Sequence, residues 1–149
     1  MERMTARERA KQDKALLTLL SKWQSVEDQT IKSCETIMKK TKNPIISTIS
    51  RAIKNDSEKH KSILQLVING MTKNGFVLSP DDLADVASLL NRHISLEQKS
   101  IEVATKAIGL TQDTITVQLL KLILEDEKKH KKMAEQINNL KIAITGKIT

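Results

Sequence analysis

The sequence repeats itself at an offset of 70 residues, with no gap between the two copies. Across residues 19–67 and 89–137, 12 of 49 aligned positions are identical. Three of the identical pairs are acids or histidines: Glu27 with Glu97, Asp56 with Asp126, and His60 with His130. Self-similarity at a fixed period indicates repeated structural units. We therefore expect residues 13–69 and 80–144 to fold in the same way.

Each copy is expected to form a helical hairpin. Apolar residues recur at alternating steps of three and four, which is typical of the inward face of a bundle helix. The pattern predicts four helices at about 13–40, 44–69, 80–109 and 114–144. Capping residues precede the last three segments: Asn43, Ser79 and Asp113. Glycines follow the second and third segments: Gly70 and Gly109. The tail after Thr145 is expected to fray.

Composition supports an all-α fold and excludes several functions. Aromatic residues make up 1% of the chain, so aliphatic side chains must do the packing. The single cysteine, Cys34, excludes a disulfide framework and a cysteine-ligated metal site within this chain, and a cytoplasmic protein is expected. No apolar run approaches a membrane span. The net charge of +7 comes from lysines spread along every helix, so we expect no nucleic-acid surface.

The predicted inward faces carry ionisable groups. Each copy places a glutamate, Glu27 or Glu97, on its first helix, and an aspartate with a histidine on its second. Counted from the turn that joins the two helices, these groups lie at similar heights. An isolated buried carboxylate costs several kcal/mol unless it is paired, protonated or bound to a metal. The pattern therefore favours a carboxylate and histidine metal site in a single four-helix bundle of residues 1–149.

These residues resemble the ferritin-like di-metal carboxylate proteins, which include ferritins, bacterioferritins and rubrerythrins. That family has a Glu on helices 1 and 3 and Glu-x-x-His on helices 2 and 4. Glu27 and Glu97 match the first and third helices, and Glu127-x-x-His130 matches the fourth. On helix 2, His60 matches, but Ser57 stands where the family has glutamate. The resemblance covers about residues 16–144 and implies a ferritin-like bundle.

The resemblance implies that the chain binds iron or manganese, as one or two ions. Glu27 and His60 would hold one ion and Glu97 and His130 the other, with Glu127 bridging. Such a site reacts with oxygen or peroxide, which leaves a di-metal oxidoreductase of ferroxidase or peroxidase type as an open activity. The chain has no Tyr for a radical and one Cys, so electrons for turnover would come from an external donor.

Two further features follow from the same resemblance. Ser57 is too short and uncharged to bridge, which points to a weakened second site or a mononuclear centre. In some family members, an aspartate at the position of Asp56 and Asp126 accepts a hydrogen bond from a ligand histidine. Such an aspartate does not itself bind the metal.

Alternatives remain open at several residues. A metal-free helical scaffold or interaction domain, with His60 and His130 as hydrogen-bonded core residues, would have the same pattern. His93 aligns with Trp23 in the repeat, so it is either a packing residue or an additional ligand. Glu58 lies about 100° round the helix from Ser57 and is expected to be solvated. The link at 70–79 leaves the topology open, and flat helical faces leave a homodimer open.

Overall fold

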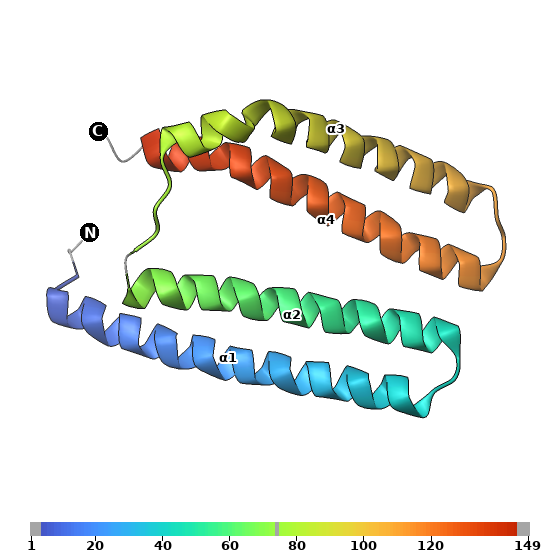
Figure 1. Ribbon diagram of the computed structural model, residues 1–149, viewed down its shortest axis with the longest axis horizontal. Coiled ribbons are helices and arrows are strands. Elements are labelled where there is room, and N and C mark those ends of the chain that lie inside the picture. Colours follow the sequence, from blue (N-terminus) through green and yellow to red (C-terminus); the bar gives the residue numbers. More distant parts are fainter. Residues whose placement is uncertain (1–3, 74, 146–149) are drawn as a thin grey trace. The chain divides into compact units, whose positions relative to one another are not determined.

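The computed structural model describes residues 4–73 and 75–145, with side chains described as far as Leu140. These residues form four helices and no strand, so the all-α prediction is confirmed. The helices are α1 Ala6–Lys40, α2 Pro44–Thr72, α3 Pro80–Gly109 and α4 Thr114–Thr145 (Figure 1). No helix in the described part of the chain is both long and apolar enough to cross a membrane. The tail after Thr145 and the side chain of Ile144 lie outside the described residues.

Side-chain caps start the last three helices where the sequence predicts. Asn43 Oδ1 accepts a hydrogen bond from the backbone N–H of Ile45 at 2.9 Å. Ser79 accepts one from the N–H of Asp82 at 3.2 Å, and the Asp82 carboxylate accepts one from the N–H of Ser79 at 2.8 Å. Asp113 caps α4 through a further backbone N–H at 2.8 Å. Each cap satisfies donors that the first turn leaves unpaired.

Two helices are longer than predicted, α1 at its start and α2 at its end. The first helix begins at Ala6 rather than near residue 13, because Thr5 and Glu8 form a reciprocal capping box. The second helix continues past Gly70 to Thr72. Gly70 lies inside the helix, where its missing side chain leaves room for the ring of Phe76; a Cβ atom there would lie 2.5 Å from that ring. The glycine therefore accommodates the link instead of ending the helix.

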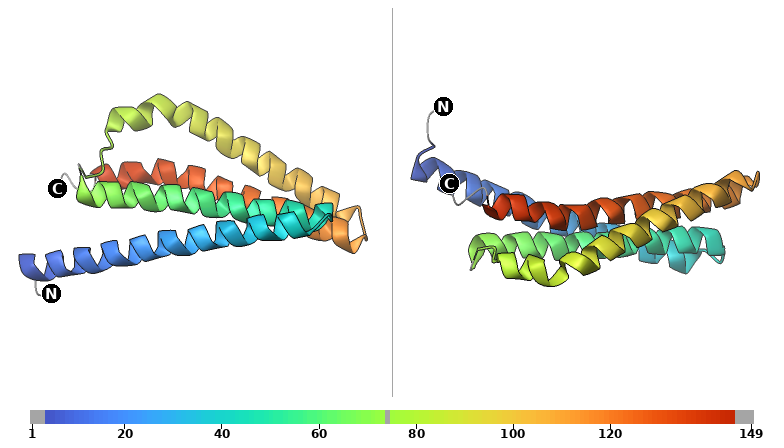
Figure 2. Two further views of the ribbon diagram at one scale, coloured as in Figure 1. Left: turned by 60° about the horizontal axis from the view of Figure 1, so that its bottom comes forward. Right: turned by 90° about the horizontal axis from the view of Figure 1, so that it is seen from above.

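The chain divides into two compact units, Met1–Val77 and Leu78–Thr149, and each is a hairpin. In the first, α1 packs against α2, and in the second α3 packs against α4. The helices of each pair run antiparallel from a short turn (Figure 1), and Figure 2 shows both pairs from two further directions. The link from Lys73 to Ser79 can span at most about 29 Å between the ends of α2 and α3. The α2 helix, with 29 residues, is about 43 Å long. The link is therefore too short to run the length of α2.

The buried residues of each hairpin form a narrow seam with a spacing of seven. On α1 the seam residues are Leu20, Glu27 and Cys34, and on α2 they are Ser50, Ser57 and Leu64. The α3 helix repeats the pattern with the buried Leu83 and Glu97. Other residues of the predicted inward faces stay exposed, such as Leu16 at 43% and Trp23 at 55%. A pair of helices buries only a narrow line of side chains. Glu27 lies on this line in the first hairpin, and Glu97 lies on it in the second.

Candidate metal centre

In the α1–α2 hairpin, hydrogen-bond donors surround the carboxylate of Glu27. The indole Nε1 of Trp23 donates to Oε1 at 3.1 Å, and Nδ1 of His60 lies 3.2 Å from the same oxygen. The Ser57 hydroxyl, which is almost fully buried, also hydrogen-bonds to this carboxylate. The Glu27 side chain is only 11% exposed. Three partners therefore satisfy a buried carboxylate without a metal ion.

These partners keep Glu27 ionised. The Ser57 hydrogen bond has the largest effect and lowers the pKa of Glu27, burial acts in the opposite direction, and Trp23 and His60 lower the pKa further. Hydrogen bonds to the charged form favour that form. Ser57, which in sequence is only a missing ligand, thus acts as the main stabilising partner of the charge.

The α3–α4 hairpin places a different set of groups at the matching positions. Glu97, Glu127 and His130 each offer one ligand atom, and these three atoms lie within 4.8 Å of one another. The Glu97 side chain is 9% exposed, and Oε1 lies 3.9 Å from Nδ1 of His130. The other oxygen, Oε2, is buried and has no hydrogen-bond partner among the described residues. This hairpin therefore holds a buried carboxylate oxygen that lacks a partner.

The pKa of Glu97 moves in the opposite direction to that of Glu27. A hydrogen bond with the Glu127 carboxyl group, which forms only when one of the two groups carries a proton, raises the pKa of Glu97 most. Burial and the charge of Glu127 raise this pKa further, and the nearby charges of His130 and His93 lower it less. Two ionised carboxylates have no proton to share, so Oε2 of Glu97 then lacks a donor. Leaving such an atom buried costs about 1–3 kcal/mol or more. A divalent cation would satisfy both carboxylates, and the donor set of two Glu and one His suits Fe(II) or Mn(II).

No protein-family model, curated protein or solved structure matches this chain. The ferritin-like resemblance stays a prediction. The case for a metal centre depends on the geometry of the cluster itself.

The structure thus brings the predicted ligands together in two groups, one in each hairpin. Asp56 and Asp126 lie nearer to water than predicted, with side chains 43% and 48% exposed. Each is held by the lysine three residues further on, Lys59 at 2.7 Å and Lys129 at 3.0 Å. Their predicted hydrogen bonds to ligand histidines stay predictions.

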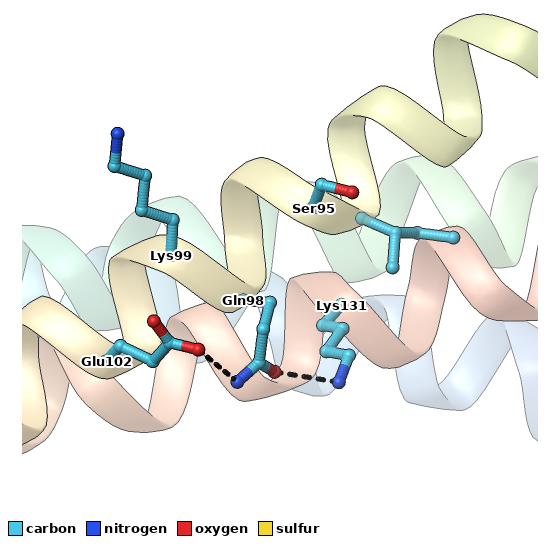
Figure 3. Close-up of a pocket in the computed structure, with 6 residues that line it drawn as sticks. Ser95, Gln98, Lys99, Glu102 and Lys131 are labelled. Atoms are coloured by element: carbon cyan, nitrogen blue, oxygen red, sulfur yellow. Dashed lines mark hydrogen bonds between the residues drawn. The ribbon is translucent and has the colours of Figure 1, made fainter.

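A polar contact fixes the height of α3 against α4 beside the cluster. Lys131 donates to Oε1 of Gln98 at 2.8 Å, and the Gln98 amide donates to Glu102 at 3.3 Å (Figure 3). These residues lie in an open pocket lined by Ile94, Ser95, Gln98, Lys99, Glu102 and Lys131. Gln98 and Lys131 directly follow Glu97 and His130 in sequence. The contact therefore links α3 and α4 at the level of the two ligands.

An ion pair does the same in the other hairpin. Lys61 lies 2.5 Å from Asp28, and these residues follow His60 and Glu27 directly. In both copies, the lysine after the histidine thus contacts the residue after the glutamate on the facing helix.

The sequence did not predict that Trp23 would contact Glu27, and it left His93 open as a packing residue or an additional ligand. Trp23 contacts Glu27, and His93 Nε2 lies 2.9 Å from Oε1 of Glu97. The available signal was the four-residue spacing to the glutamate at matching repeat positions, which puts both side chains on one face of the helix.

Proposed function

We propose that this chain is a metal-binding protein of the ferritin-like type, which binds Fe(II) or Mn(II) through Glu97, Glu127 and His130. One observation carries the proposal: Oε2 of Glu97 is buried without a partner inside a cluster of metal-ligand side chains. A second carboxylate in that cluster makes an empty site electrostatically unfavourable, and a divalent ion removes that penalty.

The two hairpins differ in how they treat the same carboxylate position. Glu27 has three hydrogen-bond partners, whereas Oε2 of Glu97 is buried with none. We therefore assign the tighter site to the α3–α4 hairpin, with one ion per chain at low metal concentration. Glu27 and His60 form a weaker site, as expected where Ser57 replaces the family glutamate.

A bundle of all four helices is part of this proposal. Its support is that each hairpin, considered by itself, leaves an apolar stripe exposed beside its glutamate. On α1 the stripe contains Leu19, Trp23 and Val26, which are 62%, 55% and 48% exposed. On α3 it contains Leu89, Leu96 and Val103, which are 63%, 56% and 60% exposed. Contiguous apolar stripes of this kind require a covering surface.

When bound, Fe(II) or Mn(II) would supply redox chemistry with oxygen or peroxide. The residues of this chain would hold the ion: Glu97 and Glu127 through carboxylate oxygens, and His130 through a ring nitrogen. Among the described residues, the only thiol, that of Cys34, is buried. Sustained turnover would therefore draw electrons from an external donor.

The alternative is a metal-free helical scaffold, and one observation favours it. The α1–α2 hairpin shows that this fold satisfies a buried glutamate with Ser57, Trp23 and His60 alone. Calorimetric titration of chelator-treated protein with Mn(II) separates the two functions. Metal binding predicts saturable binding that Glu97→Gln removes and Glu27→Gln retains, whereas the scaffold predicts no saturable binding in any variant.

A further inference from the structure

His93 lies at the edge of the α3–α4 cluster and belongs to no assigned site. It is one helical turn before Glu97, and its Nε2 atom lies 2.9 Å from Oε1 of that glutamate. The His93 side chain is 54% exposed, so the imidazole has room to turn about its side-chain bonds. Residues four apart on a helix lie on one face, and that spacing lets two side chains bind one metal ion.

The repeat supplies a comparison within the same chain. Trp23 occupies the matching position, and its ring nitrogen also contacts the matching glutamate, at 3.1 Å. An indole N–H can only donate a hydrogen bond, whereas an imidazole nitrogen can bind a metal. The hairpin with Trp23 also has Ser57, and the hairpin with His93 has Glu127 at the position matching Ser57. At both positions, one copy has a group that hydrogen-bonds to a carboxylate, and the other has a side chain of a type that can bind a metal ion.

The distance between Glu97 and His93 is close to that of two ligands of one ion, whereas the distance between Glu97 and His130 is longer. The Oε1 atom of Glu97 lies 2.9 Å from a nitrogen of His93 and 3.9 Å from a nitrogen of His130. Two ligand atoms that each bind one metal at about 2.1 Å are about 3.0–3.4 Å apart when they are neighbours in octahedral or tetrahedral geometry. His93 also lies outside the group of ligand atoms that are within 4.8 Å of one another, so its imidazole would turn toward Glu127 and His130 to share their ion. Two carboxylates and two neutral imidazoles also balance the charge of a divalent ion.

We propose that His93 is a fourth ligand, which completes a site of Glu97, Glu127, His130 and His93 within one hairpin. This inference rests on the proposed metal-binding function. It adds that the α3–α4 hairpin supplies two imidazoles to a single ion, and that this hairpin's site needs no ligand from the rest of the chain.

The repeat also provides the test, through the full-length variant His93→Trp. This change installs the residue of the other copy and keeps a ring N–H that can donate to Glu97. Mn(II) is titrated by calorimetry, and pulsed electron paramagnetic resonance counts the imidazole nitrogens coupled to the ion. We expect two coupled imidazoles in the unmodified protein and one in His93→Trp, with affinity lower by at least about 10-fold. Circular dichroism confirms helix content, and His93→Gln provides a second variant that also keeps a donor.

The outcomes separate the two proposals. If the unmodified protein binds Mn(II) with one coupled imidazole and His93→Trp binds it as tightly, His93 is not a ligand while metal binding stands. If His93→Phe weakens binding and His93→Trp does not, His93 acts only as a hydrogen-bond donor, which also overturns the inference. If the unmodified protein binds no Mn(II), the proposed function itself fails.

Discussion

Replacing each repeated glutamate with glutamine should change the stability of the metal-free protein in opposite directions. Glu27→Gln and Glu97→Gln are the same chemical change at positions 70 residues apart. At Glu27 the change removes a charge that three partners stabilise. At Glu97 it removes one of two crowded carboxylates, and the amide that replaces this carboxylate can donate a hydrogen bond to the neighbouring Glu127 carboxylate.

The magnitudes follow from the two environments. Two charges within 4.8 Å of one another repel by at least about 3.5 kcal/mol at an effective dielectric constant of about 20. Water on the open side of the hairpin screens this repulsion, so we expect Glu97→Gln to stabilise the metal-free protein by about 1 kcal/mol. Hydrogen bonds to a charged group exceed neutral ones by about 1–1.5 kcal/mol, so Glu27→Gln should destabilise by about 1–2 kcal/mol. Each kcal/mol shifts the Tm by about 2–4 °C at this chain length.

The pH dependence gives the same prediction a second check. The pKa of Glu27 is lowered below its usual 4.5, so its stabilising contribution is present above pH 4.5 and is lost as the pH falls through the folded-state pKa. The pKa of Glu97 is raised above 4.5, so its stabilising contribution is fully present below pH 4.5 and is lost as the pH rises through the folded-state pKa. Both glutamine variants should therefore approach the parent protein in stability at acid pH and diverge from it, in opposite directions, at neutral pH.

Urea unfolding with excess chelator, followed by circular dichroism from pH 4 to pH 8, measures these differences. Each variant serves as the control for the other, because both remove one negative charge from the same place in a repeated hairpin. Equal shifts of the same sign at pH 7.5 would refute the reasoning, since the two carboxylates would then have equivalent surroundings.

Three further predictions concern the sites and the first helix. His130→Ala should lower Mn(II) affinity in the α3–α4 hairpin by at least about 10-fold in a calorimetric titration, while the matched control His60→Ala leaves the tighter site intact. Ser57→Glu restores the second Glu-x-x-His and should add a second bound ion, seen as quenching of the fluorescence of the single tryptophan, Trp23, by Mn(II); unchanged stoichiometry would remove His60 as a ligand. Thr5→Ala should destabilise by about 1 kcal/mol through loss of the α1 cap, and urea unfolding would detect this.

Local signals predicted most of the fold. The residues Asn43, Ser79 and Asp113 marked three helix starts because their side chains bond to backbone N–H groups within three residues, which a sequence shows directly. The start of α1 was missed because its capping box, at Thr5 and Glu8, lies well before the first apolar repeat. The predicted start near residue 13 came from the first apolar residues of the helical pattern, but the capped helix continues through polar residues back to Ala6.

The sequence predicted the ligands of the candidate site but not the side-chain contacts that surround them. Periodicity and the repeat placed Glu97 and His130 on facing sides of α3 and α4, and the structure brings them together with Glu127. The sequence did not show that Ser57 would act as the main partner of Glu27, because that depends on two side chains meeting across a seam. Side-chain contacts between helices follow from the packing and not from spacing along one helix.

The most direct test of the account is the number of ions bound by the full-length chain. Chelator-treated protein is titrated with Fe(II) under argon or with Mn(II), and bound metal is measured after equilibration. The account predicts one tightly bound ion per chain, which Glu97→Gln abolishes and Glu27→Gln leaves in place. Absence of bound metal, or equal loss in both variants, would contradict it.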